Sequence, residues 1–218
     1  MTEEELKEMA AQLRKPAGEK GLKTGEWMNS GNFQMNQDTL RVLEPKNGDS
    51  ILEIGMGNGL FVKNILENRP SLRYTGCDFS HEMVEEAKKM NNFWVNNEQA
   101  RFINTSAIKL PFENKSFDKI FSVNTIYFWD NEPAILKEFK RVLKPGGCFI
   151  LALRPKHQMI KYPFTKYGFS MFSKEEVFIL LQNNGFIVTQ SYENTEPDFE
   201  LNGEAMKMEN LIVAAKPY

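Results

Sequence analysis

The stretch Ile51-Leu-Glu-Ile-Gly-Met-Gly-Asn-Gly59 sets the architecture predicted for this chain. It contains a short apolar strand, an acid at Glu53 and a Gly-x-Gly-x-Gly turn, and a helical pattern begins at Leu60. Strand, glycine turn and helix in this order form the opening unit of nucleotide-type binding folds. Glycines let the backbone turn sharply and approach a ligand closely. The stretch therefore predicts a ligand-binding turn, and the remaining sequence has to identify the ligand.

The composition is that of a globular protein with almost balanced charge. Of the 218 residues, 41% are hydrophobic and 26% are charged, and 29 acids nearly cancel 27 bases. These values predict one domain with decorations and do not favour a nucleic-acid partner. No apolar run is long enough for a membrane span, and the N-terminus is too acidic for a signal peptide, so we expect a cytoplasmic protein. Cys77 and Cys148 lie in apolar runs, and with only His81 and His157 besides we expect no metal site.

Strands and helices alternate from the strand before the glycine turn to residue 153. Strands are expected over residues 50–54, 72–77, 100–104, 117–123 and 148–153. Helices are expected over residues 60–68 and 80–90 and in a segment with Pro133 in its first turn. This alternation predicts an α/β fold with a parallel sheet that is doubly wound by helices. A helix with the capping box Ser173-x-x-Glu176 and strands over 186–191 and 209–216 follow, and Asn202-Gly203 is typical of an antiparallel hairpin.

The first 46 residues are expected to form a helical cap or lid, and residues 47–218 the core, with a substrate-side insert at 154–172. Thr2-x-x-Glu5 is a capping box that opens a helix over residues 2–13. The segment from there to Gly31 is rich in Gly and Lys and has weak periodicity, which predicts a mobile lid or a partner-dependent arm. An ordinary surface excursion is the alternative. Helical spacing returns over residues 32–43.

The glycine turn departs from the dinucleotide-binding pattern. That pattern is Gly-x-Gly-x-x-Gly, whereas here the third glycine, Gly59, comes one position early. Glu53 would repel a pyrophosphate, and no Gly-Lys-Ser/Thr follows, which excludes a Walker loop. Asp78 ends the second expected strand, 19 residues after Gly59, where such folds place the acid that binds ribose hydroxyls. A helix cap is the alternative role for Asp78. We therefore expect a ligand with a ribose and a positive charge.

With these residues in place, the sequence resembles the class I S-adenosylmethionine-dependent methyltransferases, in particular the small-molecule type. Residues 52–59 are similar to their first motif, and Cys77-Asp78 to the end of their second strand. Leu110-Pro-Phe with Ser116-Phe-Asp118, and residues 136–147, are similar to later motifs in the same order. The resemblance covers residues 47–216 and implies a seven-stranded sheet in the order 3-2-1-4-5-7-6 with an antiparallel last strand. It also implies S-adenosyl-L-methionine as cofactor and S-adenosyl-L-homocysteine as product.

The resemblance further implies which residues hold the cofactor. They lie in the glycine turn, after the second strand, before Leu110 and after the strand over 117–123. They are Glu53, Gly55, Met56, Gly57, Gly59, Asp78, Phe79, Met83, Ser106, Ala107 and Asn124. The sequence departs from the family at the adenine end, because Thr105-Ser106-Ala107 stands where the family has Gly-Asp-Ala. Ser106 can still form a hydrogen bond with the adenine amino group, but without a charge.

The acceptor side is less defined, because methyl transfer needs positioning and exclusion of water rather than a nucleophile of the protein. His157 and Tyr127 are candidate catalytic groups, and a solvated loop histidine is the competing interpretation of His157. Candidate substrate-binding residues are Tyr127, Trp129, Tyr162 and Asn32. Packing of the following helix is an equal alternative for Trp129.

The sequence thus predicts in-line methyl transfer to a small-molecule acceptor by a monomer or homodimer. An RNA or protein methyltransferase stays open, since Lys156, Lys161 and Lys166 could form a small electropositive track. A non-catalytic S-adenosylmethionine-binding protein also stays open, although the intact glycine turn and Asp78 speak against it. Nothing in the sequence identifies the acceptor atom.

Overall fold

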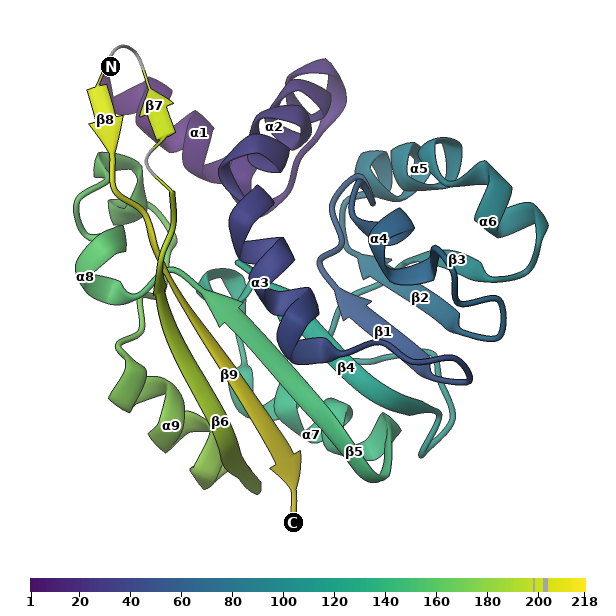
Figure 1. The fold of residues 1–218 in the computed structure, drawn as a ribbon. Coiled ribbons are helices and arrows are strands. Elements are labelled where there is room, and N and C mark those ends of the chain that lie inside the picture. The colour runs from purple at the N-terminus through teal and green to yellow at the C-terminus, as the bar shows by residue number, and fades with distance from the viewer. Residues whose placement is uncertain (198, 202–203) are drawn as a thin grey trace.

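The computed structural model describes the backbone of residues 1–197, 199–201 and 204–218. It describes the side chains of all residues except 198–206. Its centre is a seven-stranded sheet with the strand order β3-β2-β1-β4-β5-β9-β6 (Figure 1). The strands are β1 (Ser50–Ile54), β2 (Arg73–Asp78), β3 (Ala100–Asn104), β4 (Phe117–Val123), β5 (Leu143–Leu153), β6 (Phe186–Thr195) and β9 (Glu209–Pro217). Strands β1 to β5 pair in parallel, and β9 is antiparallel to both β5 and β6. The predicted sheet, with its antiparallel last strand, is confirmed.

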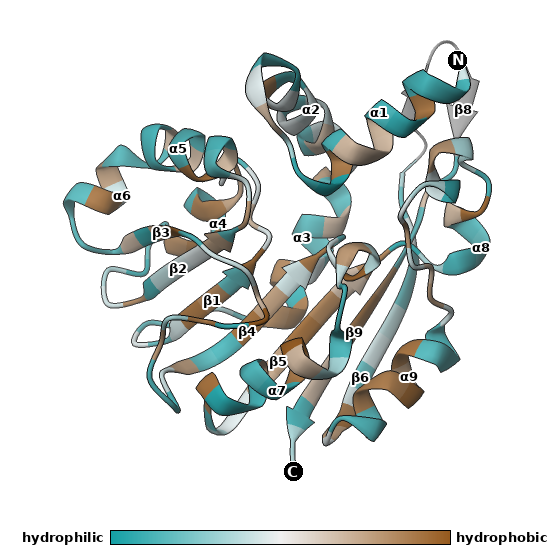
Figure 2. Cartoon of the chain, turned by 180° about the vertical axis from the view of Figure 1, so that it is seen from behind, coloured by the Kyte–Doolittle hydropathy of each residue, from teal (hydrophilic) through white to brown (hydrophobic). Residues whose placement is uncertain are grey.

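Helices cover both faces of this sheet, as the strand–helix alternation predicted. One face packs against α3 (Phe33–Leu43), α4 (Val62–Leu66) and α5 (His81–Met90). The other packs against α7 (Glu132–Val142) and α9 (Lys174–Asn183). Successive residues of a strand point to opposite faces, so Ile51 lies in the first core and Leu52 in the second. The central strands are therefore apolar on both sides, and β5 is mainly brown in the hydropathy colouring, whereas α5 is mostly teal (Figure 2).

The N-terminal segment is more helical than its composition predicted. Helix α1 (Glu3–Arg14) begins with the predicted capping box, in which Glu5 N donates to Thr2 Oγ1 at 3.2 Å. The Gly- and Lys-rich segment, expected to be a lid or arm with weak periodicity, forms the regular helix α2 (Gly18–Gly31). Its buried glycines explain the difference, because they allow close packing. A Cβ at Gly21 would lie 2.6 Å from the Pro16 carbonyl carbon, and one at Gly25 would lie 3.2 Å from Met83. These glycines let α2 approach Pro16 and Met83 closely, and they do not break the helix.

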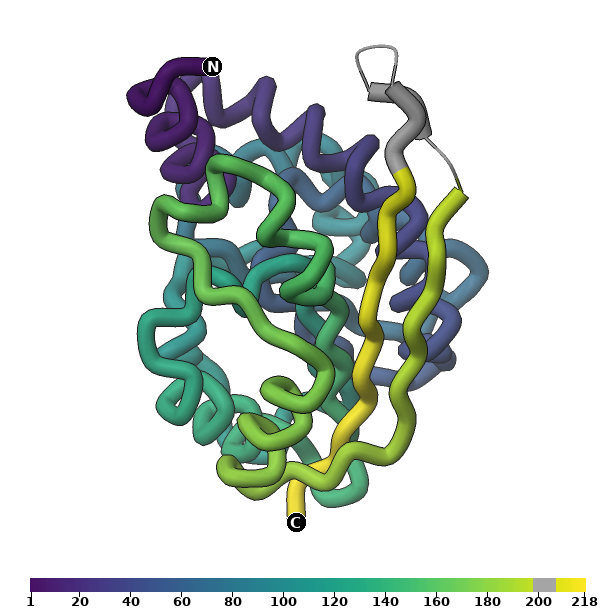
Figure 3. Tube along the Cα trace, turned by 90° about the vertical axis from the view of Figure 1, so that its left-hand side faces the viewer, coloured from purple at the N-terminus to yellow at the C-terminus, as the bar shows by residue number. Residues whose placement is uncertain are grey.

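Short elements complete the fold. The helix α6 (Asn92–Asn96) follows α5, and the insert after β5 contains α8 (Lys156–Met159) and the 3-10 helix η2 (Pro163–Lys166). A second, two-stranded sheet is formed by β7 (Phe199–Leu201) and β8 (Glu204–Met206) (Figure 1). The long strands β6 and β9 run side by side as an antiparallel pair (Figure 3). The predicted Asn202-Gly203 turn lies outside the described residues. Within the part of the chain that the structure describes, no helix has the length and apolar character that a membrane crossing requires.

Candidate functional site

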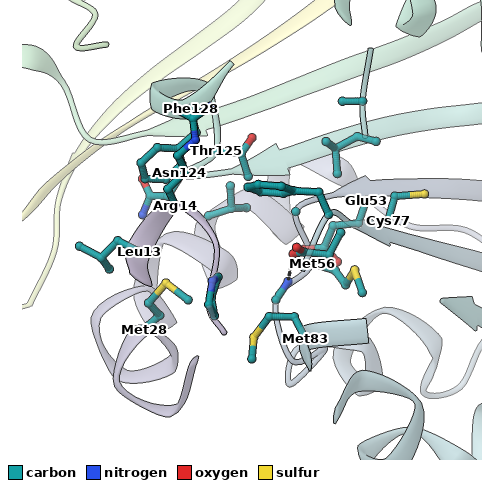
Figure 4. A pocket seen from close by; sticks show the side chains of 18 of the residues that line it. Leu13, Arg14, Met28, Glu53, Met56, Cys77, Met83, Asn124, Thr125 and Phe128 are labelled. Carbon is teal, nitrogen blue, oxygen red and sulfur yellow. Dashed lines mark hydrogen bonds between the residues drawn. The ribbon is translucent and has the colours of Figure 1, made fainter. Parts of the chain in front are cut away.

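A pocket lies at the carboxyl ends of β1, β2 and β4, and the N-terminal helices form its opposite side (Figure 4). Ligands bind at this edge in open α/β sheets, because the strand order reverses there and the connecting loops part. The pocket has two walls. The "glycine wall" consists of residues 53–58, 77–79, 83 and 105–108. The "cap wall" consists of residues 13, 14, 16, 25, 28, 29, 32 and 36 from the N-terminal helices, with residues 124, 125 and 128–130.

The turn after β1 requires glycine for two different reasons. Gly55 and Gly57 have φ angles of 75° and 57°, which a side chain makes unfavourable. At Gly55 an added Cβ would also collide with the side-chain methyl group of Thr125. At Gly57 no neighbouring atom lies within 4 Å of the added Cβ, so the backbone is open to the pocket. The turn therefore brings bare backbone to the pocket surface.

Asp78, at the end of β2, is tied to this turn. Its Oδ2 accepts a hydrogen bond from Gly57 N at 3.1 Å, and its Oδ1 accepts one from Ser80 N at 2.8 Å. Burial raises the pKa of the carboxyl to about 6, although these backbone donors lower it. Ser80 caps α5 by accepting from Met83 N at 3.2 Å. Asp78 thus holds the local backbone and lines the pocket, while Ser80 and not Asp78 is the N-cap of α5. Ribose binding by Asp78 stays a prediction.

Glu53 lies beside Asp78 and gives this wall acidic character. Tyr74 donates its hydroxyl to Glu53 Oε2 at 2.5 Å, and burial raises the pKa of Glu53 to about 7. The charged side chains that line the pocket, among the described residues, are Glu53, Asp78, Arg14 and Asp130. Asp130 neutralises Arg14 in a two-pronged ion pair. A pyrophosphate would face two acids without a free base, whereas a cation is favoured.

The end of the pocket beyond Asp78 combines apolar and small polar side chains. Phe79 and Met83 line it together with Ser106, Ala107 and Ile108. The Ser106 hydroxyl is held weakly, because it accepts from Ile108 N at 3.4 Å. Such a surface fits a flat heterocycle with an exocyclic amino group. The acidic turn, the open backbone and this apolar end fit S-adenosylmethionine.

Ten of the eleven residues predicted for the cofactor line this pocket; the exception is Gly59. Gly59 has a φ of 72° and its carbonyl accepts from Asn91 Nδ2 at 3.0 Å, so it shapes the turn from behind. The individual roles of the ten residues stay predictions.

The cap wall is fastened to the core by polar contacts between distant residues. Arg14 Nη2 donates to both carboxylate oxygens of Asp130, at 2.6 and 2.7 Å. Asn124 Nδ2 donates to Asn32 Oδ1 at 2.8 Å. Ser80 Oγ donates to the Pro16 carbonyl oxygen at 2.5 Å. The N-terminal helices therefore enclose the pocket instead of standing apart from it.

The candidate substrate residues separate into two groups. Asn32 and Trp129 line the pocket, although Trp129 is largely buried and packs edge-on against Phe139. Tyr127 is buried outside the lining, where its hydroxyl donates to Asn124 Oδ1 at 2.9 Å and accepts from Arg154 N at 2.5 Å. Burial raises the pKa of Tyr127 well above its usual value. As placed, Tyr127 supports the pocket from behind.

His157 and Tyr162 lie in the insert and do not line the pocket. The His157 side chain is 58% exposed, and its Nε2 lies 2.7 Å from Glu209 Oε2. Tyr162 stacks on Phe164, and its hydroxyl contacts Met208 Sδ at 3.1 Å. The structure thus agrees with the competing interpretation of His157 as a solvent-facing residue.

Several lining residues carried no signal in the sequence. Leu13, Arg14, Phe128 and Asp130 meet at the pocket because α1 packs against η2 of the insert and Arg14 pairs with Asp130, which follows η1 (Ile126–Phe128). Arg14 and Asp130 are 116 positions apart, so no local pattern could pair them. Asn29 and Asn36, in contrast, have a spacing from Asn32 that predicts one shared site, and all three line the pocket.

Comparison with known proteins gives the same picture. The methyltransferase domain family matches residues 52–151. An uncharacterized methyltransferase of Bacillus subtilis, YdaC, is 31% identical over 132 residues, which cover 61% of this chain and 71% of that protein. The ubiquinone/menaquinone biosynthesis C-methyltransferase UbiE of Desulfotalea psychrophila is 32% identical over 134 residues, covering 59% of this chain and 53% of the relative. The chain thus spans about half the length of this second relative.

A solved structure is similar over almost the entire chain. It belongs to the complex between the Haloferax volcanii Trm112 methyltransferase activator and a methyltransferase. The TM-score is 0.78 at 18% identity, with 96% of this chain and 97% of that chain covered. At this identity the similarity concerns the fold, and it includes the N-terminal helices.

Proposed function

This chain belongs to the class I S-adenosylmethionine-dependent methyltransferase family, and on that premise we propose that it methylates a small organic acceptor. The observation that carries the proposal is the closed cap wall. Helices α1 and α2 are joined to the core by the Arg14–Asp130 pair and by the bond from Ser80 to Pro16. An acceptor that must fit beneath these helices is a small molecule and not a folded macromolecule.

The family's cofactor, S-adenosyl-L-methionine, supplies an electrophilic methyl group on a sulfonium centre. We propose that the carboxylate of Asp78 accepts hydrogen bonds from the ribose and that the open backbone at Gly57 contacts the amino-acid part. Glu53 adds negative charge beside the turn, which favours a cationic ligand. Phe79 and Met83 would pack against the adenine, and Ser106 would bond its amino group.

The acceptor is proposed to sit against the cap wall. Its side chains there are the amides of Asn29, Asn32 and Asn36 and the apolar groups of Met28 and Phe128. Because Arg14 and Asp130 neutralise each other, this wall favours an uncharged acceptor group. The protein's contribution is then to orient the acceptor and to exclude water. We propose that residues 1–46 act as the cap and 47–218 as the core.

The curated relatives support a small acceptor. UbiE is named for ubiquinone and menaquinone biosynthesis, and such quinones are small molecules. Since this chain spans about half of UbiE, the identity of its own acceptor requires experiment.

The test is to incubate the chain and a cell extract with S-adenosylmethionine that carries a labelled methyl group. The extract is then divided into small-molecule, RNA and protein fractions. We expect label in the small-molecule fraction, and much less there with the Asp78→Asn variant at a cofactor concentration that just saturates the wild type. Label confined to RNA or protein would contradict the proposal.

A further inference from the structure

We propose that Arg154, which lies outside the pocket, is a positioning residue that sets the α2–α3 junction, and with it Asn32, against Asn124. Arg154 directly follows β5 and is only 5% exposed. Its side chain contacts both Gly31 and Glu209, so it joins the end of α2 to the start of β9. The proposal rests on the proposed cofactor site and does not depend on which acceptor is methylated. A result that excludes a small-molecule acceptor would therefore leave it intact.

The guanidinium of Arg154 contacts three segments of the chain. Nη2 donates to the Gly31 carbonyl oxygen at 2.6 Å, at the end of α2. Nη1 donates to the Glu209 carbonyl oxygen at 3.1 Å, at the start of β9. Both nitrogens also donate to the carboxylate of Glu196, at 3.1 and 3.2 Å. A planar fork with several donors is needed to serve all three acceptors at once.

Glu196 fixes this guanidinium from the opposite side. It is 7% exposed and its Oε1 also accepts from Asn210 Nδ2 at 3.0 Å. Asn210 Nδ2 lies 3.1 Å from Asp38 Oδ2, so the network reaches the middle of α3. Buried charges of this kind persist only when they are paired and hydrogen-bonded. The network therefore holds Arg154 in one orientation.

Two routes lead from Arg154 to the same pair of asparagines. Its side chain holds Gly31, and the next residue, Asn32, accepts from Asn124 Nδ2 at 2.8 Å. Its backbone N–H donates to the Tyr127 hydroxyl at 2.5 Å, and that hydroxyl donates to Asn124 Oδ1 at 2.9 Å. The contacts close a ring around Asn32 and Asn124, both of which line the pocket. Displacing the guanidinium would therefore shift Asn32 without touching the glycine wall.

Arg154→Lys separates positioning from stability. A lysine keeps a positive charge opposite Glu196, but its single ammonium group cannot also hold Gly31 in the fork geometry. We expect a melting temperature near that of the wild type. We also expect S-adenosylhomocysteine to bind roughly tenfold more weakly in calorimetry, about the loss of one charge-assisted hydrogen bond. In the wild type we expect the cofactor product to slow tryptic cleavage between residues 15 and 23, and in Arg154→Lys we expect this protection to be lost.

The matched control is Lys119→Met. Lys119 pairs with Asp49 at 2.9 Å, and their side chains are 15% and 16% exposed at the opposite end of the sheet. This change should lower the melting temperature but leave cofactor affinity and cleavage protection as in the wild type. A second variant, Arg154→Met with Glu196→Gln, removes both buried charges and should fold while binding as weakly as Arg154→Lys. Wild-type affinity in either Arg154 variant, or an equal loss of affinity in Lys119→Met, would overturn the proposal.

Discussion

The two walls of the pocket are built in different ways. In the glycine wall, Gly55, Gly57 and Asp78 are set by a turn and a strand end that belong to one strand–helix–strand unit. In the cap wall, Arg14 meets Asp130 and Asn32 meets Asn124 across 116 and 92 positions of the chain. The first wall depends on backbone geometry and the second on side-chain contacts between distant segments. We therefore expect changes in the glycine wall to have larger effects than changes in the cap wall.

The largest effect is expected from Gly55→Ala. The alanine would combine a positive φ with a collision against Thr125, so the free energy of unfolding should fall by about 3 kcal/mol or more. Gly146→Ala is the matched control, because Gly146 has a φ of 81° but no atom within 4 Å of the added Cβ. It should cost about 1–2 kcal/mol. Urea denaturation measures both, and equal losses would mean that the tight packing at Gly55 is irrelevant.

Asp78→Asn is expected to have the next largest effect, and it acts on binding. The amide removes the charge that faces the ligand, and its NH₂ group is a donor that cannot accept from Gly57 N or Ser80 N, so one of these two hydrogen bonds is lost. Affinity for S-adenosylhomocysteine should fall by about 2 kcal/mol, roughly thirtyfold. Asp118→Asn is the control, since Asp118 binds Ser50 and Lys144 at the other end of the sheet. Calorimetry that finds similar affinities for both variants would contradict the assigned role of Asp78.

The acidic pair predicts a pH dependence of cofactor binding. Burial raises the pKa of Glu53 from 4.5 to about 7, so its neutral form stabilises the free protein, and this contribution is lost as the pH rises through 7. A bound cation favours the carboxylate instead. Affinity for S-adenosylmethionine should therefore rise from pH 5.5 to 8, by at most about tenfold per pH unit for each proton released.

Glu53→Gln tests the source of this dependence. The amide cannot ionise but can still accept the Tyr74 hydrogen bond, so the rise above pH 6 should flatten. The remaining dependence would come from Asp78, whose pKa burial raises to about 6. S-adenosylhomocysteine, which lacks the sulfonium charge, should show a weaker rise with the wild type. An unchanged slope in Glu53→Gln would assign the titration to another group.

The smallest effect is expected in the cap wall, from Arg14→Gln. The side chains of Arg14 and Asp130 are 37% and 68% exposed, and ion pairs in such positions contribute at most about 1 kcal/mol. Release of S-adenosylhomocysteine should become faster by a factor below about five, and salt should have less influence on it. Lys23→Gln breaks the exposed pair with Glu19 on the same cap and should change nothing. If Arg14→Gln abolished binding, the cap wall would matter as much as the glycine wall.

The sequence predicted the elements whose determinants are local. Strands β1, β3 and β4 begin and end where the apolar runs do, and the caps Thr2, Ser80 and Ser173 open their helices. Helix α2 was not predicted, because glycine is a poor helix former in isolation and its value here lies in contacts with Pro16 and Met83. A pattern within the segment cannot reveal a partner outside it.

The same division applies to the site. The sequence predicted the residues of the glycine wall from the turn after β1 and from the end of β2. Gly59, which was predicted with them, does not line the pocket and supports the turn from behind. The candidates Tyr127, Tyr162 and His157 do not line the pocket, and Arg14, Phe128 and Asp130 do. Their positions depend on how α1 and the insert pack on the core. That packing is a tertiary property with no local signature.

Parallel calorimetric titrations with S-adenosylhomocysteine and with NAD test most directly whether the acidic glycine turn selects an adenosyl ligand without phosphate over a pyrophosphate. We predict one S-adenosylhomocysteine bound per chain and no heat of binding for NAD, because Glu53 and Asp78 face the ligand without a free base. Binding of NAD, or a chain that binds neither compound, would contradict this assignment.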